Sequence, residues 1–163
     1  YRYNRPMADI NIENFYRHIA KILNILYIHF PTKAPIYVDE VAGIDEPDEY
    51  GLHSPTYMAG FYALLWLEEE GYLRYSDTIR QDGIDQASLT HKALLKLTEV
   101  TDPIYIDTSA DVNASTVVML QPVETLSPSI IEERKMVINQ LRVALKSGSS
   151  IAITKMVNYI LHS

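Results

Sequence analysis

Five histidines and a run of carboxylates are the residues of this 163-residue chain with the greatest capacity for chemistry. The histidines are scattered along the sequence, at His18, His29, His53, His91 and His162. None of them belongs to an HExxH zinc motif, and the sequence has neither a phosphate-binding glycine loop nor a Gly-x-Ser-x-Gly turn. The chain also lacks cysteine, which excludes disulfides, thiolate metal sites and cysteine nucleophiles. We therefore predict a non-enzymatic protein without catalytic residues and without a cofactor.

The carboxylates gather shortly before His53, at Asp45, Glu46, Asp48 and Glu49. Such side chains suit Ca²⁺ or Mg²⁺, but their spacing lacks the pattern of an EF-hand loop and its central glycine. We therefore predict a solvated acidic loop with no bound metal. A docking surface for a basic partner is the second hypothesis for this segment.

Four cations could contact nucleic acid, and all lie in or just after a predicted hairpin: Arg74, Arg80, Lys92 and Lys96. An arginine at the tip of such a hairpin can enter a minor groove or contact phosphate. Three aspartates in the same hairpin nearly cancel this charge, namely Asp77, Asp82 and Asp85. An ordinary solvated hairpin is therefore the favoured interpretation, and DNA binding is the alternative.

The formal net charge of −7 is distributed unevenly along the chain. Basic residues outnumber acidic ones in 1–38, whereas 39–71 and 98–126 contain acidic residues but no lysine or arginine. Phosphate neutralisation supplies most of the affinity of nucleic-acid binders, so this pattern argues against tight general DNA binding. No apolar run approaches the roughly 18 residues of a membrane-spanning helix, and we expect a cytoplasmic protein that binds no membrane.

A first helix is predicted from Asn11, which can serve as its N-cap, until the prolines at 31 and 35 forbid a further turn. Its apolar residues have helical spacing, at Phe15, Ile19, Ile22, Leu26 and Phe30. Three short segments are predicted next: a strand at Ile36–Val38, one helical turn at Asp39–Gly43 and an irregular loop at Asp45–His53.

Ser54 and Pro55 form a favourable start for a second long helix, which is predicted to run to Glu70 and to stop at Gly71. Two strands follow, at residues 72–79 and 84–90, with the turn Gln81-Asp82-Gly83 between them. Thr90 can cap a further helix that ends near Thr98.

The order of these elements resembles the winged helix-turn-helix family over residues 11–98. The most similar features are the Leu-Glu-Glu-Glu-Gly-Tyr-Leu step from helix to hairpin and the Leu-Thr-x-Lys-Ala sequence after it. The resemblance implies a fold more than a function, since the family includes regulators and assembly proteins. The acidic segment 39–53 departs from the family, because it replaces the compact second helix and tight turn.

The helix at 55–70 would be the recognition helix of a DNA-binding member, but its outward face holds Ala59, Ala63, Trp66 and Glu70. A base-reading helix would carry Arg, Lys, Asn or Gln there. A helix that is apolar on both faces is usually buried on both. We therefore predict a protein interface at Ala59, Ala63 and Trp66. The competing interpretation is that Trp66 is covered by the hairpin of its own domain.

The C-terminal part is predicted to hold a pair of amphipathic helices after an acidic connector, with "IYI" at 104–106 and "VVML" at 117–120 as its apolar patches. Ser129 and Glu132 suggest a capping box for the first helix, and Gly148 its end. Two apolar stripes result: Ile130, Val137, Leu141 and Leu145, and then Ile153, Met156, Val157 and Ile160. Short helices cannot bury such stripes alone. They must fold back on their own domain or pair with a second chain, and we predict a dimer through Leu141, Leu145, Met156 and Ile160.

The sequence thus predicts a mainly α protein with a small β-hairpin, organised as a winged helix-turn-helix domain and a C-terminal helical pair. The predicted divisions are an N-terminal arm, or residues added ahead of a natural start at Met7, at 1–10; the winged-helix domain at 11–98; the connector at 99–126; and the helical pair at 127–163. The favoured function is assembly or regulation through protein–protein contacts. The alternative is a DNA-binding transcriptional regulator that uses the hairpin and the basic first helix.

Overall fold

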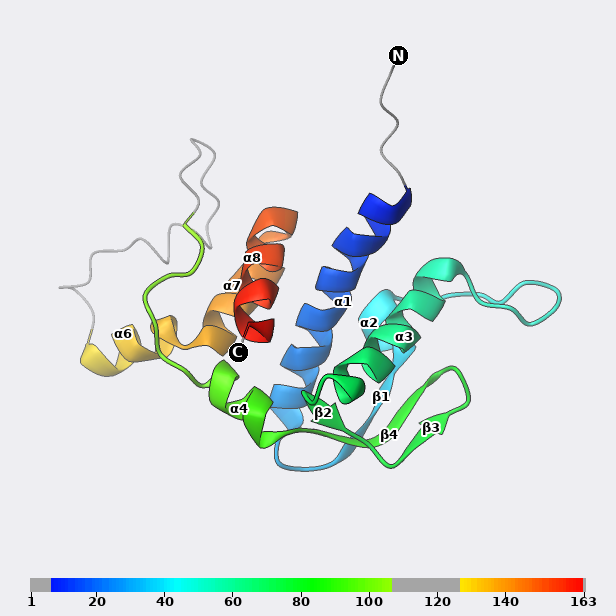
Figure 1. The fold of residues 1–163 in the computed structure, drawn as a ribbon, viewed down its shortest axis with the longest axis horizontal. Coiled ribbons are helices and arrows are strands. Elements are labelled where there is room, and N and C mark those ends of the chain that lie inside the picture. The colour runs from blue at the N-terminus through cyan, green and yellow to red at the C-terminus, as the bar shows by residue number, and fades with distance from the viewer. Residues whose placement is uncertain (1–6, 107–126, 163) are drawn as a thin grey trace, which may run out of the picture. The chain divides into compact units, whose positions relative to one another are not determined.

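The computed structural model describes residues 7–106 and 127–162 and divides the chain into two compact units, residues 1–93 and 94–163. The chain is mainly helical, with one small antiparallel sheet in the first unit (Figure 1). The helix α4, His91–Leu97, spans the boundary between the two units. The "VVML" patch of the connector lies outside the described residues.

The first helix, α1, is Met7–His29 and therefore begins earlier than the sequence predicted. Asn11 lies inside the helix and does not cap it, which corrects the prediction made from its side chain. The reason is local, because methionine and alanine at positions 7 and 8 are strong helix formers. The predicted stripe does face the core, where its central residues are fully buried together with a neighbour: Ile19, Ile22, Leu23 and Leu26.

The sheet is built around one strand, β4 (Gly83–Leu89), to which the other three pair antiparallel. These are β1 (Ala34–Tyr37), β2 (Leu73–Arg74) and β3 (Asp77–Ile79). The predicted hairpin is thus confirmed, with an interruption at residues 75–76 that splits its first strand in two. Gly83 is required at the start of β4, because a Cβ there would lie 2.3 Å from the carbonyl oxygen of Ile36 on β1.

The helix α3, Pro55–Glu69, is capped as the sequence predicted. The amide of Tyr57 donates to Oγ of Ser54 at 3.2 Å, and Gly71 follows the helix with a left-handed φ of 84°. Tyr57, Phe61 and Leu64 are buried on its inner face. The short helix α2, Val38–Ala42, precedes it, and α3 packs against both α1 and α2 (Figure 1).

The second unit contains α6 (Pro128–Lys135), α7 (Val137–Ser147) and α8 (Ser150–Leu161). The single helix predicted after residue 127 is therefore two, and its cap is Ser127, whose Oγ accepts from the amide of Ile130 at 3.4 Å, in place of Ser129. The two helices are separated at Met136, which is extended and pairs with Val100 in an antiparallel bridge. The predicted stop at Gly148 is confirmed by its left-handed φ of 72°.

The two C-terminal stripes are buried within the single chain, where α7 packs against α8. Six of their residues are at most 2% exposed: Val137, Leu141, Ile153, Met156, Val157 and Ile160. Leu145 is half-buried, and Ile130 is 41% exposed. Little of this apolar surface is therefore left to drive pairing with a second chain.

Residues 99–104 lie along the same helices as an ordered arm. The amide of Val137 donates to the carbonyl of Glu99 at 2.9 Å. The buried side chain of Gln140 fixes the rest of the arm, since Nε2 donates to the carbonyl of Thr101 at 3.1 Å and Oε1 accepts from the amide of Ile104 at 2.9 Å. The first part of the predicted connector thus belongs to the second unit.

Candidate functional site

A groove with a volume of about 500 Å³ lies between α1 and α3, which run side by side in the first unit (Figure 1). We call it the α1–α3 groove. Its lining is mostly apolar and comes from the first half of α1 and the outward face of α3: Asn11, Phe15, Pro55, Met58, Ala59, Tyr62, Ala63 and Trp66.

The predicted interface residues of α3 all lie in this groove. Ala63 is 2% exposed, while Ala59 and Trp66 are half-buried. The ring of Trp66 packs edge-to-face on Phe15 of α1, with ring centroids 5.0 Å apart. An aromatic pair in this geometry stabilises the packing of α1 against α3 by more than the burial of its apolar area alone. Trp66 is therefore covered on one side by its own unit, and its groove side is available.

Five of the eight groove residues were not predicted to belong to an interface, among them Phe15 and Tyr62. Phe15 was assigned to the core stripe of α1, and Tyr62, which is 56% exposed, had no assigned role. The helical spacing of Tyr62 could have indicated its place in the groove, because Tyr62 shares the helical face of Ala59, Ala63 and Trp66. Nothing in the sequence pairs that face with Phe15, since the contact depends on how the two helices pack.

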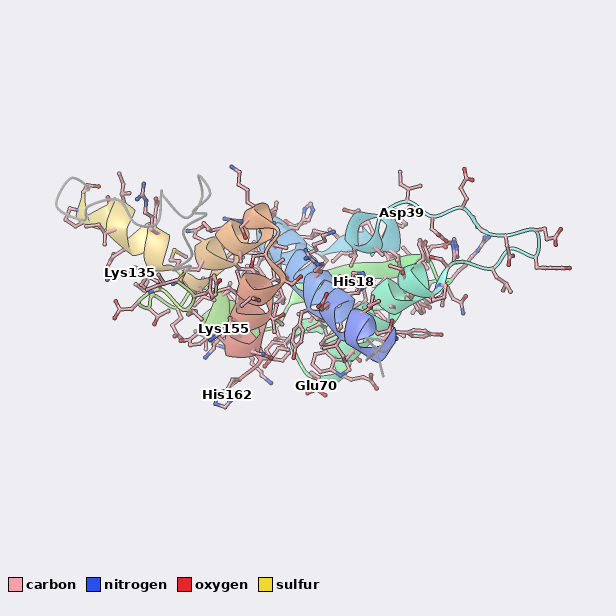
Figure 2. All side chains as sticks on the ribbon, turned by 90° about the horizontal axis from the view of Figure 1, so that it is seen from above. His18, Asp39, Glu70, Lys135, Lys155 and His162 are labelled. Carbon is pink, nitrogen blue, oxygen red and sulfur yellow. The ribbon has the colours of Figure 1, made fainter. Side chains whose placement is uncertain are left out.

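Acidic side chains lie at both ends of α3. Glu68, Glu69 and Glu70 are exposed at its C-terminal end, where Figure 2 labels Glu70. At the N-terminal end lies the loop of residues 43–54, which extends away from the helices in Figures 1 and 2. Glu46, Asp48 and Glu49 are exposed on it.

A cluster around His53 fastens the acidic loop to the start of α3 and to the hairpin turn. Nδ1 of His53 lies 3.0 Å from Oδ2 of Asp45, and Nε2 lies 3.4 Å from Oδ1 of Asp82. The same Asp45 oxygen accepts from the amide of Ser54 at 3.0 Å. The imidazole stacks on the ring of Tyr57, with centroids 3.8 Å apart. The predicted solvated loop is thus anchored at its two ends.

The electrostatics of this cluster follow from its hydrogen bonds. The amide of Ser54, followed by the contact with His53, holds the pKa of Asp45 below its ordinary value. Burial, together with the Asp82 carboxylate, raises the pKa of Tyr57 to about 12. The Tyr57 hydroxyl therefore stays protonated and donates to Oδ1 of Asp82 at 3.3 Å. These contacts join the acidic loop, the start of α3 and the hairpin turn.

The four cations of the alternative DNA hypothesis fall into two groups. Arg74 and Arg80 are exposed on the hairpin. Lys92 lies over the ring of Tyr72, 4.3 Å from its centroid, and donates to the carbonyl of Glu70 at 3.2 Å. Lys96 lies over the ring of Tyr159 at 4.2 Å and pairs with Glu99 at 3.7 Å. The two lysines are thus held by contacts within the chain.

The predicted C-terminal interface residues lie in a different environment. Leu141, Met156 and Ile160 are buried in the second unit, and Leu145 is half-buried. Within residues 7–106 and 127–162, no three His, Asp or Glu side chains are arranged to hold a metal ion together. No helix in the described part of the chain is long and apolar enough to cross a bilayer.

No family model matches the sequence, and no curated protein or solved structure is significantly similar to it.

Proposed function

We propose that this chain is a non-enzymatic winged helix-turn-helix protein that acts by binding another protein through the α1–α3 groove. The class is supported by the order of elements in the first unit: helix, strand, two helices and a hairpin whose last strand also pairs with the first strand. This order is that of the family that the sequence resembles. In this order of elements, α3 occupies the position of the family's recognition helix.

The observation that carries the proposal is the apolar groove on the outward face of α3. A helix that recognises bases needs polar or basic side chains on this face. Here the face presents two alanines, a tyrosine and a tryptophan around a hollow that is large enough for several side chains. Apolar hollows lined by aromatic side chains are where protein partners place their anchoring residues. An amphipathic helix is the partner segment that such a groove accepts most readily.

The proposal does not use the C-terminal helices as a dimer interface. The sequence predicts self-association through their stripes because short helices cannot bury such stripes alone, and burial inside one chain supplies that cover. We place the activity in the cytoplasm, because a chain without cysteine suits a reducing compartment.

The test begins with a displayed library of helical peptides, from which those that bind the full chain are selected. The binding of the selected peptides is then measured for wild type and for two variants. Peptides that occupy the groove should bind wild type and lose affinity for Tyr62→Glu, which places a charge on the groove wall at an exposed position. They should retain affinity for Tyr50→Glu, the matched control, whose side chain is 79% exposed on the acidic loop and outside the groove. Trp66 is the only tryptophan, so its emission reports occupancy directly. Failure to recover any peptide that distinguishes Tyr62→Glu would overturn the proposed function.

A further inference from the structure

We infer that the segment recognised by the α1–α3 groove is an amphipathic helix with small and medium apolar residues in its middle and lysine or arginine at both ends. This inference rests on the proposed function and adds the chemistry of the partner.

The middle of the groove sets the apolar part of the partner. Ala59 is half-buried, and its short side chain leaves a strip of α3 that another backbone can approach, whereas Ala63, one helical turn further on, is 2% exposed and already covered. The strip is bordered by the rings of Phe15, Tyr62 and Trp66. A helix with small or medium apolar side chains fits between such borders, whereas one with several large aromatic residues would exceed a volume of about 500 Å³.

The first end of the groove is acidic because the loop before α3 is fastened there. Pro55 lines the groove, and the amide of the preceding residue, Ser54, is bound by Asp45 at 3.0 Å. His53 holds the same carboxylate at 3.0 Å, so the start of the acidic loop cannot move far from the start of α3. Glu46 follows Asp45 directly, so its exposed carboxylate lies next to this fixed base, whereas Glu49 belongs to the turn at the far end of the loop.

The second end is acidic because of the helical repeat of α3. Glu69 and Glu70 follow Trp66 by three and four residues, so they continue the face that lines the groove. Lys92 supplies one opposing charge at this end through its contact with the carbonyl of Glu70, and the three successive glutamates exceed it.

The cations of α1 that the structure describes do not line the groove. Among the described residues, those that line it include no lysine or arginine. Arg17 and Lys21 of α1 are two and six residues from Phe15, which puts them about 200° and 240° around the helix from the groove. The groove thus presents an apolar middle between two negative ends, and complementary charge on the partner increases both its association rate and its specificity.

The experiment uses one peptide selected on wild type, synthesised in three forms that share the apolar residues. The ends carry lysine, glutamine or glutamate, and binding is followed through Trp66 emission. We expect the lysine form to bind most tightly, the glutamine form roughly three- to tenfold more weakly and the glutamate form weaker still, since exposed ion pairs contribute modestly. The preference should disappear near 1 M salt, where the Debye length is about 3 Å.

Protein variants assign the charge to each end. Glu46→Gln should reduce the lysine preference at one end of the peptide, and Glu69→Gln with Glu70→Gln at the other. Asp102→Asn, at an exposed carboxylate of the second unit, is the control and should leave the preference unchanged.

The outcomes separate the inference from the proposed function. Equal affinity of the three forms, with binding still lost in Tyr62→Glu, overturns the basic-ended partner and leaves the groove as a binding site. Tightest binding by the glutamate form also overturns it. Absence of any selected peptide that is sensitive to Tyr62→Glu overturns both. Peptides that match a helix of this chain identify a second copy as the occupant, which contradicts the inference unless that helix also has basic ends.

Discussion

The imidazole of His53 and the carboxylate of Asp45 are joined by a 3.0 Å contact between Nδ1 and Oδ2, which closes the acidic loop at the start of α3. The two residues are eight positions apart in sequence. The contact turns a segment that the sequence describes only as acidic and irregular into a loop with a fixed base. Asp82 of the hairpin turn, 3.4 Å from Nε2 of His53, extends the attachment to the sheet.

This loop closure should fail in acid. The pKa of Asp45 is lowered from its ordinary value of 3.8 in the fold, so its stabilising effect is complete above that value and is lost as pH falls through the folded pKa. We expect the Ser54 amide, which donates to Asp45, to lose its protection against exchange, relative to its intrinsic rate at each pH, as the pH falls below 3.8. NMR exchange rates on wild type and Asp45→Asn would show this, with Glu49→Gln as control. A carboxyl titration midpoint for Asp45 above 3.8 would contradict it.

The buried His18 should make stability depend on pH in a higher range. It is 4% exposed, its Nδ1 has no hydrogen-bond partner in the described structure, and burial, followed by the charge of Lys21, lowers its pKa from 6.5. Below pH 6.5 the unfolded chain therefore binds a proton that the folded chain does not. The free energy of unfolding should fall as pH drops below 6.5 and be insensitive to His18 above it.

The check is urea unfolding between pH 5 and 8, followed by Trp66 emission. His18→Leu should flatten the decline, whereas His29→Leu, at the exposed end of the same helix, should retain it. An unchanged slope in His18→Leu would exclude His18 as the cause.

Ala63→Arg should destabilise the first unit. The Ala63 side chain is only 2% exposed. An arginine at this position would therefore overpack its neighbours and bury an unpaired charge. Changes of this kind cost about 2–5 kcal/mol. Tyr62→Arg, at the neighbouring exposed position, should cost less than about 1 kcal/mol. Chemical unfolding monitored through Trp66 measures both, and equal stability of Ala63→Arg and wild type would show that this face is open.

Random duplex DNA should bind weakly or not at all at physiological salt. The segment 39–71 contains no lysine or arginine, and Lys92 and Lys96 are held by Tyr72 and Tyr159. A fluorescence titration measures the affinity. Submicromolar binding that weakens steeply with salt and is lost in Arg74→Ala with Arg80→Ala would favour the DNA-binding alternative instead.

The full chain should have the mass of a monomer in solution. Stripe residues such as Leu141 and Ile160 are fully buried within one chain, which leaves exposed side chains such as Ile130 and Ile151 as the apolar surface of these helices. Light scattering across a concentration series tests this. A dimeric mass would restore the prediction made from the sequence. In that case Ile151→Glu, at a side chain that is 63% exposed, would show whether the C-terminal helices form the interface.

The sequence by itself determined the elements whose signals are local. Ser54 and Pro55 start α3, Gly71 and Gly148 end helices, and the hairpin follows from two strand-forming runs around a turn that contains Gly83. These signals act through side-chain caps, φ preferences and residue periodicity within a few positions, so they are visible without the rest of the chain. The apolar outward face of α3 was visible for the same reason.

Tertiary structure decided what joins segments that are distant in sequence. The break at Met136 coincides with the pairing of this residue with Val100, and a helical pattern that runs through 136 does not show that pairing. The groove exists because Phe15 and Trp66 bring two helices together, and the loop is anchored because Asp82 lies beside His53. Each of these depends on a packing geometry in which many apolar contacts combine, so the identity of the partner residues is set by the folded core and not by any local pattern.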